Sequence, residues 1–435
     1  MPTTPPPRRF HQYLLVLPLI LGACTPYHRQ WRADFSTTPL PLRPDTPSAG
    51  ERARRVFEIY GERLMLAHVE FTDQGTYWTG GQDGKKNQMD ALVTHVKDDL
   101  HQHPEKYRQG AIFITFTHGW HNNAREGNEN LARFRSSIAR IQNLETNGLN
   151  RPVIGVYLSW RGKMRPDWPR EYATTFWPRK EAAERIGYRG MANALMRLSL
   201  LRDEVGRLEG RLEGRPEFLA NSRLIVVGHS FGAQAVFSSV ARFFEDELTA
   251  ISDSADRKGY VGRRWDMIVL VNPAFEAIRY DAIHRYQQWL KYEDFYSRLP
   301  RMLVVSAEND GATGKWFPLG QALDARNRAL QSGEGEMVRH TLGNYDEFRT
   351  HRLEGNPPKL IMIPGRMDVT HRYAGPFYAP FARVTDNTDS IQPFMVAQAS
   401  SSIVARHNGI WKESFVQFLV DLIMAREESV RLYKK

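Results

Sequence analysis

Short, almost continuous apolar segments recur along the chain between longer segments in which apolar residues are spaced three or four positions apart. The short segments are rich in β-branched residues and lack the alternation of a strand with one solvent-exposed face. They are also too short for buried helices, so they predict strands buried on both faces of a parallel sheet. Five segments share this pattern: residues 111–117, 153–158, 224–227, 267–271 and 302–306.

The longer segments show the apolar spacing of amphipathic helices. They cover residues 128–144, 180–209, 233–248 and 411–432. We further expect residues 64–71 to form an antiparallel strand at the sheet edge and residues 394–404 to contain the last strand. Strands and helices that alternate along the chain predict an α/β protein with a mostly parallel central sheet and helices on both faces.

The N-terminus has the pattern of a secretory signal. Arg8 and Arg9 precede an apolar run, residues 13–21, which is shorter than the ~20 residues needed to cross a bilayer. The run ends in Leu-Gly-Ala-Cys and resembles the lipobox of bacterial lipoproteins. That resemblance implies that residues 1–23 are a signal peptide and that Cys24 becomes the lipidated first residue of the mature chain. The alternative is an ordinary cleaved signal followed by an incidental cysteine.

Residues 24–50 are rich in proline, threonine and arginine and show no sustained periodicity. This composition predicts an extended tether between the lipid anchor and a domain of residues 51–435 in which order begins near Arg52. The lipobox resemblance implies a protein of the bacterial envelope that is anchored to a membrane by lipid. The expected location is the outer membrane, on the side that faces the periplasm. Cys24 is the single cysteine, so no intramolecular disulfide is possible.

Composition narrows the class of protein. Apolar residues make up 41% and charged residues 25% of the sequence, which is ordinary for a globular protein. Loss of Arg8 and Arg9 with the signal peptide would lower the net charge from +10 to +8, a modest excess that favours anionic surfaces such as lipid headgroups. The basic residues are scattered along helices without a base-reading motif, so we expect no nucleic-acid partner.

The segment Gly228-His229-Ser230-Phe231-Gly232 matches G-x-S-x-G and lies directly between a predicted strand and a predicted helix. A sharp turn there forces the central residue into a strained conformation, and the glycines let the strand and helix backbones pass closely. We therefore expect Ser230 to be a nucleophile and the Phe231 amide, at a helix N-terminus, to stabilise an oxyanion. The alternative is a tight turn without catalysis.

A second motif, Thr117-His118-Gly119-Trp120-His121-Asn122-Asn123, follows the predicted strand 111–117. Together with the serine turn it resembles the α/β-hydrolase superfamily of lipases and esterases. The resemblance implies an α/β-hydrolase fold, and it implies that the backbone N–H of Trp120 is the second oxyanion donor. His118 and His121 also match H-x-x-H, but a loop lacks the helical face that aims two rings at one metal ion. We expect His118 to support the loop, and we expect neither metal nor cofactor.

In this family the acid follows the nucleophile in sequence, and the histidine follows the acid. That order implies Asp310, which comes after the predicted strand 302–306, as the acid. Glu308 and Glu276 are the alternatives. Asp310 also precedes a glycine, so a turn-forming role without catalysis is open for it.

His407 lies between the last predicted strand and the terminal helix, the position that the family gives to its catalytic base. His371 is the alternative, although it precedes an aromatic, proline-rich segment instead of a closing helix. Ser230, His407 and Asp310 would then form the Ser-His-Asp triad.

Residues 160–215 are expected to form a cap-like helical insertion, because the segment carries Trp160, Trp168, Phe176 and Trp177 among basic residues. It is interpreted as a cap over the pocket, as a surface that touches the membrane, or as ordinary solvated helices. The resemblance implies hydrolysis of carboxylic esters or lipids through an acyl-enzyme. Acyl transfer with the same residues and a non-catalytic envelope scaffold are the alternatives.

Overall fold

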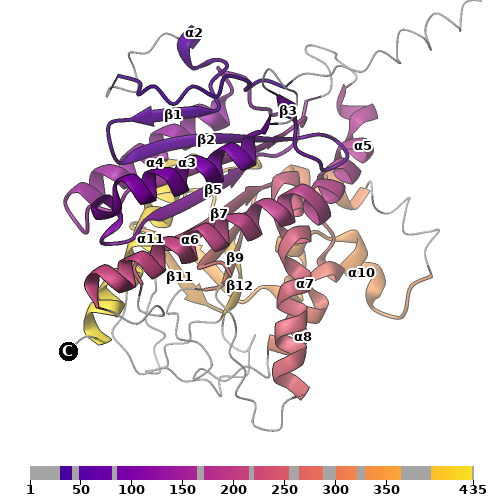
Figure 1. Cartoon of the computed structure of the whole chain (residues 1–435). Coiled ribbons are helices and arrows are strands. Elements are labelled where there is room, and N and C mark those ends of the chain that lie inside the picture. The colour runs from indigo at the N-terminus through magenta and orange to yellow at the C-terminus, as the bar shows by residue number, and fades with distance from the viewer. Residues whose placement is uncertain are drawn as a thin grey trace, which may run out of the picture.

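The structure is a computed structural model that describes residues 30–41, 49–80, 86–163, 171–214, 220–253, 264–287, 300–319, 321, 329–363 and 393–433. Its centre is a ten-stranded sheet in the order β1-β2-β6-β5-β7-β8-β9-β12-β10-β11 (Figure 1). Neighbouring strands are parallel from β2 to β10, and the outermost pairs β1·β2 and β10·β11 are antiparallel. The chain is therefore an α/β protein with a mostly parallel sheet.

The strands of this sheet are β1 (Phe57–Tyr60), β2 (Leu64–Phe71), β5 (Ile112–Thr117), β6 (Val153–Trp160), β7 (Arg223–His229), β8 (Met267–Val271), β9 (Met302–Ala307), β10 (His351–Glu354), β11 (Lys359–Met362) and β12 (Phe394–Ala399). A separate two-stranded pair consists of β3 (Thr79–Gly80) and β4 (Lys86–Asn87). The five buried runs predicted from sequence correspond to β5, β6, β7, β8 and β9.

Helices cover both faces of the sheet. On one face lie α3 (Gln88–Gln102), α6 (Ala192–Glu213) and α7 (Phe231–Asp253), and on the other lie α4 (Glu129–Thr146) and α11 (Glu413–Tyr433) (Figure 1). The remaining helical segments are α2 (Ala49–Arg52), η1 (Pro104–Tyr107), α5 (Glu171–Ile186), η2 (Gly187–Met191), η4 (Ala277–Tyr280), α8 (Asp281–Gln287), η6 (Ala312–Trp316), α10 (Glu334–Arg339), η7 (Leu342–Asn344) and η8 (Asp346–Phe348). None of the helices in the described ranges is long and apolar enough to cross a membrane.

Each face of the sheet has its own apolar core. Phe113 of β5 packs with the residues under α3, α6 and α7, whereas its neighbours Ile112 and Ile114 pack with Phe134 of α4 and Phe415 of α11. Successive side chains of a strand point to opposite faces, so a strand covered on both sides is apolar at most positions, and its polar side chains need buried partners. This explains why the central strands are continuous apolar runs.

The prediction for residues 64–71 was wrong in position and direction. β2 is the second strand of the sheet, parallel to β6, and the antiparallel edge strand is β1. All eight residues of β2 are buried, and its polar members His68 and Glu70 bind other buried polar groups. Their polarity makes the strand resemble a half-exposed edge, although both of its faces are covered. The β10–β11 hairpin at the other edge was not predicted.

Part of the expected tether is packed against the domain. Residues 30–41 lie along β1 and β2, with bridges from Asp34 to Arg55 and from Leu40 to Tyr60. Order therefore begins well before the expected start near Arg52. The physical reason is Arg32, whose side chain is fully buried and forms ion pairs with buried carboxylates. Residues 1–23, which were predicted to be a signal peptide, and Cys24 lie outside the described residues.

The expected cap-like segment divides into two parts. Helix α6 packs against α3, α7 and β7, so it belongs to the helical layer that covers the sheet. Helix α5 also packs against α7, and its second half contributes to the apolar core. Its first half approaches the loops at the carboxyl ends of the strands, where the Phe176 ring contacts Trp120 and Phe231. Within the described part of this segment, the first half of α5 therefore lies where a cap would lie, whereas Trp160 is the last residue of β6. Trp168 lies outside the described residues.

Candidate active site

Ser230 occupies the sharp turn between β7 and α7. Its φ angle is +57°, in the left-handed region that costs energy for any residue except glycine. A Cβ atom at Gly232 would come within 2.3 Å of the Thr117 carbonyl oxygen, and one at Gly228 within 2.8 Å of the Ala233 Cα. Both glycines are thus required by the close approach of backbones that the motif predicts.

His407 connects Ser230 to a carboxylate. Its Nε2 lies 2.8 Å from the Ser230 Oγ, and its Nδ1 lies 2.7 Å from the Asp310 Oδ2. With a proton on Nδ1, the ring donates to Asp310 and accepts the serine hydroxyl proton at Nε2. The structure brings together the three residues that the family order implied, from loops far apart in the sequence.

The loop that carries His407 is held by two side chains that the sequence analysis did not identify. The amide nitrogen of Asn272 donates to the carbonyl oxygens of Arg406, at 3.1 Å, and His407, at 2.8 Å. The Nε2 of His229 donates to the same His407 oxygen at 2.9 Å. Burial and the nearby His407 lower the pKa of His229 to about 3, so this ring stays neutral. Asn272 directly follows β8, and that position was the one available signal.

Asp310 is buried and well supplied with donors. Its Oδ1 accepts from the Ala312 amide at 2.9 Å, and its Oδ2 accepts from the Thr313 hydroxyl at 2.7 Å. Burial alone raises the pKa of this carboxyl, but the hydrogen bonds and charge of His407, with the Thr313 bonds, outweigh it and hold the pKa below its usual value. Asp310 therefore remains ionised, and it forms a turn and contacts His407 at the same time.

The alternative acids are engaged elsewhere. Glu308 is exposed and accepts a hydrogen bond from the Ser401 amide at 2.7 Å. Glu276 is buried, and its Oε1 pairs with the Nζ of Lys180 at 2.6 Å. Of the three carboxylates considered, Asp310 is the one that contacts His407. The alternative base, His371, lies outside the described residues.

Two backbone amides flank the Ser230 side chain. Phe231 is the first residue of α7, so its N–H has no acceptor within the helix and lies at the positive end of the helix dipole. The other amide belongs to Trp120, which follows Gly119; a Cβ atom on Gly119 would come within 2.6 Å of the Ser230 Cβ. The indole of Trp120 packs beside Phe231 and donates to the Thr175 hydroxyl at 3.2 Å. These contacts place the His-Gly loop against the turn that carries Ser230.

His118 supports this loop through hydrogen bonds to Gly119 and Ser159. Its ring is buried, with Nδ1 2.9 Å from the Gly119 carbonyl oxygen and Nε2 2.7 Å from the Ser159 hydroxyl. Burial lowers the pKa of His118 to about 4, so the ring is neutral and its Nδ1–H donates to the Gly119 carbonyl oxygen. The indole of Trp160 donates to the His118 carbonyl at 2.9 Å. The position of the loop therefore depends on side chains of β6.

Aromatic side chains form one wall beside Ser230. The ring of Phe176, on α5, lies 5.6 Å from Trp120, 5.2 Å from Phe231 and 6.4 Å from Phe317, measured between ring centroids. Phe231 and Phe317 are almost fully buried and Phe176 is partly buried, so the rings form one apolar cluster.

Comparisons with known proteins do not identify a family for this chain. No protein-family model matches the chain, and no curated protein matches it. Among solved structures, it has a similarity to the crystal structure of an uncharacterized protein from Pseudomonas aeruginosa, with 11% identity and a TM-score of 0.26. That alignment covers 83% of this chain and 52% of the other, so the chain spans about half the length of that protein. A TM-score this low carries no inference about fold or function.

Proposed function

We propose that the protein is a serine hydrolase of the α/β-hydrolase superfamily that cleaves carboxylic esters or lipids. The observation that carries this proposal is the hydrogen-bonded chain from the Ser230 Oγ through His407 to Asp310, with distances of 2.8 and 2.7 Å. A serine hydroxyl is a weak nucleophile until an adjacent base accepts its proton. The strained φ of Ser230 supports the same function, because such strain persists mainly where function requires it.

In this mechanism the Ser230 Oγ attacks the carbonyl carbon of the ester while its proton moves to the Nε2 of His407. The carbonyl oxygen becomes an oxyanion that accepts hydrogen bonds from the amides of Phe231 and Trp120. Asp310 stabilises the imidazolium and keeps its ring oriented. The alkoxide leaves with the proton from His407, and an acyl-serine remains.

Water completes the cycle. His407 removes a proton from the water as it attacks the acyl carbon, and the carboxylic acid leaves Ser230 with its hydroxyl proton restored. The aromatic wall of Phe176, Trp120 and Phe231 supports a substrate with an apolar acyl or alkyl group. An alcohol in place of water would make the same residues an acyltransferase.

We place this reaction at the bacterial envelope, where the lipidated Cys24 would hold the protein on a membrane. The expected site is the outer membrane, on the side that faces the periplasm. The support is the apolar run that ends in Leu-Gly-Ala-Cys. A single acyl chain gives only marginal membrane binding, whereas several chains on one cysteine give stable anchorage.

A fluorophosphonate probe tests the proposed chemistry. The full chain should become labelled, and peptide mapping should locate the adduct on Ser230, because only an activated serine attacks the phosphorus. Ser230→Ala is the direct control, and heat-denatured protein controls for non-specific reaction. A folded protein that takes up no probe would point to the non-catalytic scaffold instead.

A further inference from the structure

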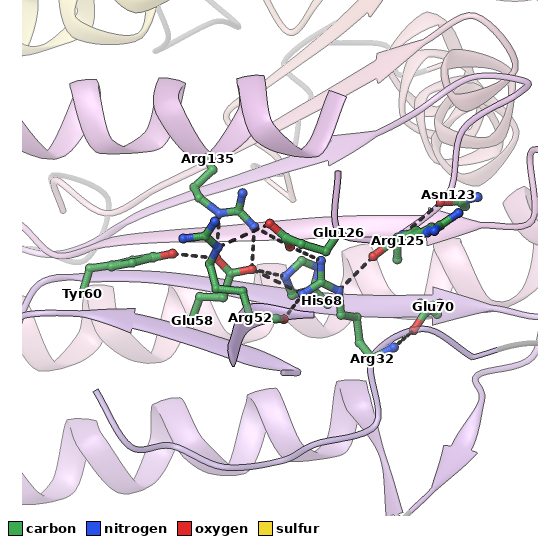
Figure 2. A network of polar contacts seen from close by, with 11 residues as sticks. Arg32, Arg52, Glu58, Tyr60, His68, Glu70, Asn123, Arg125, Glu126 and Arg135 are labelled. Carbon is green, nitrogen blue, oxygen red and sulfur yellow. Dashed lines mark hydrogen bonds and ion pairs between the residues drawn. The ribbon is translucent and has the colours of Figure 1, made fainter. Parts of the chain in front are cut away.

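The segment that leads to the proposed lipid anchor is fastened to the domain at Trp31 and Arg32. The Arg32 amide donates to Glu70 at 2.8 Å, and its carbonyl accepts from Gln88 at 2.6 Å. Its fully buried guanidinium donates to the Ala124 carbonyl oxygen at 2.8 Å and pairs with Glu126 at 2.9 Å (Figure 2). These bonds fix both the backbone and the side chain of Arg32. The distance between the domain and Cys24 is therefore set by the residues that precede Trp31.

The segment enters the domain at the same edge of the sheet that carries Ser230. Glu70 lies next to the last residue of β2, in register with Ser159 near the end of the parallel strand β6. Ser230 directly follows the last residue of β7, which is parallel to both strands through β5. Parallel strands end at the same edge, so the anchor segment and the nucleophile share the carboxyl edge.

The sequence between Cys24 and Trp31 is short. Six residues separate Cys24 from Trp31, and an extended chain spans at most about 3.6 Å per residue. Trp31 therefore lies within roughly 25 Å of the lipidated cysteine, a distance smaller than a domain of this size. A domain held so closely must turn one side to the bilayer, and that side includes the carboxyl edge.

Exposed apolar side chains lie on the loops of this edge. Trp316 is 73% exposed and Leu319 is 63% exposed, on the segment that follows Asp310, and Trp177 of α5 is 38% exposed. Their neighbours Phe317 and Phe176 turn inward and contact each other. Phe317 and Phe176 belong to the aromatic wall beside Ser230, whereas the exposed side chains project away from that wall. Tryptophan is enriched where proteins meet the membrane interface.

The charges on these loops are of both signs, with a small excess of cations. In residues 118–128, 308–319 and 400–412 the exposed cationic side chains are those of Arg125, Lys315, Arg406 and Lys412, and the exposed carboxylate is Glu308; the exposed carboxylates Glu129 and Glu413 follow directly after two of these loops. Basic residues near an anionic bilayer surface add to binding. The exposed apolar side chains, rather than the charges, are therefore the main feature that agrees with the position of the anchor.

We propose that the carboxyl edge of the sheet, with Trp316, Leu319 and Trp177, rests on the bilayer that holds the lipid anchor. This inference builds on the anchorage at Cys24 given under the proposed function. It gives the site a substrate source: Ser230 opens toward the membrane surface, so the ester it cleaves belongs to a lipid or amphiphile of that membrane.

A depth measurement tests this orientation. Cys24 is occupied by lipid, so a second cysteine introduced as Leu319→Cys can carry an environment-sensitive fluorophore on its own. The matched control is Leu144→Cys, which replaces another exposed leucine, in the last turn of α4 near the start of β6. Both lipidated proteins are placed in vesicles of phosphatidylethanolamine and phosphatidylglycerol that contain a nitroxide-labelled lipid, after thermal unfolding has shown that each is folded.

The label at position 319 should be quenched several-fold more strongly than the label at position 144, and its emission should shift to shorter wavelength. Equal quenching at both positions, stronger quenching at 144, or none at either overturns the inference. A chain that takes up no fatty-acid probe at Cys24 overturns it together with the proposed anchorage. The proposed hydrolysis is judged separately, by fluorophosphonate labelling of Ser230.

Discussion

Gly119 and Ser230 lie so close together that a Cβ atom on the glycine would come within 2.6 Å of the Ser230 Cβ. The loop that carries the Trp120 amide and the turn that carries Ser230 are therefore packed without room for one methyl group. The loop and the turn meet through backbone and Cβ atoms, so a change of side-chain rotamer cannot relieve the contact.

The first prediction follows from this contact. Gly119→Ala should push the loop away from Ser230 and lower kcat by roughly 100-fold, the usual cost of losing one oxyanion donor, with a smaller effect on KM. Gly335→Ala is the matched control, since its added methyl group meets no atom closer than 4.0 Å. Steady-state hydrolysis of a p-nitrophenyl ester measures both. An unchanged kcat for Gly119→Ala would mean that this loop does not supply an oxyanion donor.

The second prediction concerns the acid. Asp310→Asn should leave the protein folded but lower kcat by up to roughly 10⁴-fold, because an amide does not hold His407 in the required tautomer. Glu308→Gln should have little effect, since Glu308 is exposed and bonds to the Ser401 amide. The same ester assay compares them. If Glu308→Gln were the damaging change, the acid would have to be reassigned.

The third prediction concerns the anchor segment. Arg32→Met should lower the free energy of unfolding by about 1 to 3 kcal/mol, because the buried carbonyl oxygen of Ala124 loses its donor while Glu58 and Glu126 keep their ion pairs with Arg135. Glu58 is fully buried, and Glu126 is largely buried. Arg54→Met, at an exposed position, should change stability far less. Urea denaturation measures both; a loss below about 1 kcal/mol at Arg32, the range of surface pairs, would show that the network contributes little.

The fourth prediction is a loss of stability in mild acid. Burial lowers the pKa of His68, His118 and His351 to about 4, whereas the unfolded chain titrates its histidines near 6.5. Below pH 6.5 the unfolded state gains protons that the folded state does not bind, so stability falls between about pH 6.5 and 4. Each such histidine costs up to about 1.4 kcal/mol per pH unit in this range.

His351 provides a test that leaves the proposed site intact, because it lies on β10 and bonds to the Thr350 hydroxyl. His351→Gln should reduce the difference in urea midpoint between pH 7 and pH 5. The parent protein should show the larger difference. Equal differences in the two proteins would mean that His351 does not stay neutral in the folded state.

The central strands and the serine turn were predictable because each depends on a local rule. A strand covered on both faces is mostly apolar, as 267–271 is, and the turn at Ser230 requires glycine where backbones nearly touch. The contact between Asp310 and His407 was predictable only through the family order. No local pattern in either segment indicates that they meet.

The remaining features depend on tertiary contacts between distant segments. β2 was misjudged because His68 and Glu70 look solvent-exposed in sequence, yet their partners come from β1 and from residues 31 and 32. Arg32 itself stands in a segment whose composition indicates a tether, and its buried position depends on Glu58 and Glu126. Propensity and periodicity do not contain such pairings.

The central claim is that His407 activates Ser230, and one comparison of turnover tests it most directly. Hydrolysis of a short p-nitrophenyl ester is measured for Ser230→Ala, His407→Ala, the double variant and His371→Ala, each shown to be folded. Residues that act as one unit lose activity together, so the first three should fall to nearly the same residual rate while His371→Ala changes far less. Near-normal turnover by His407→Ala, with His371→Ala as inactive as Ser230→Ala, would contradict the claim and assign the base to His371.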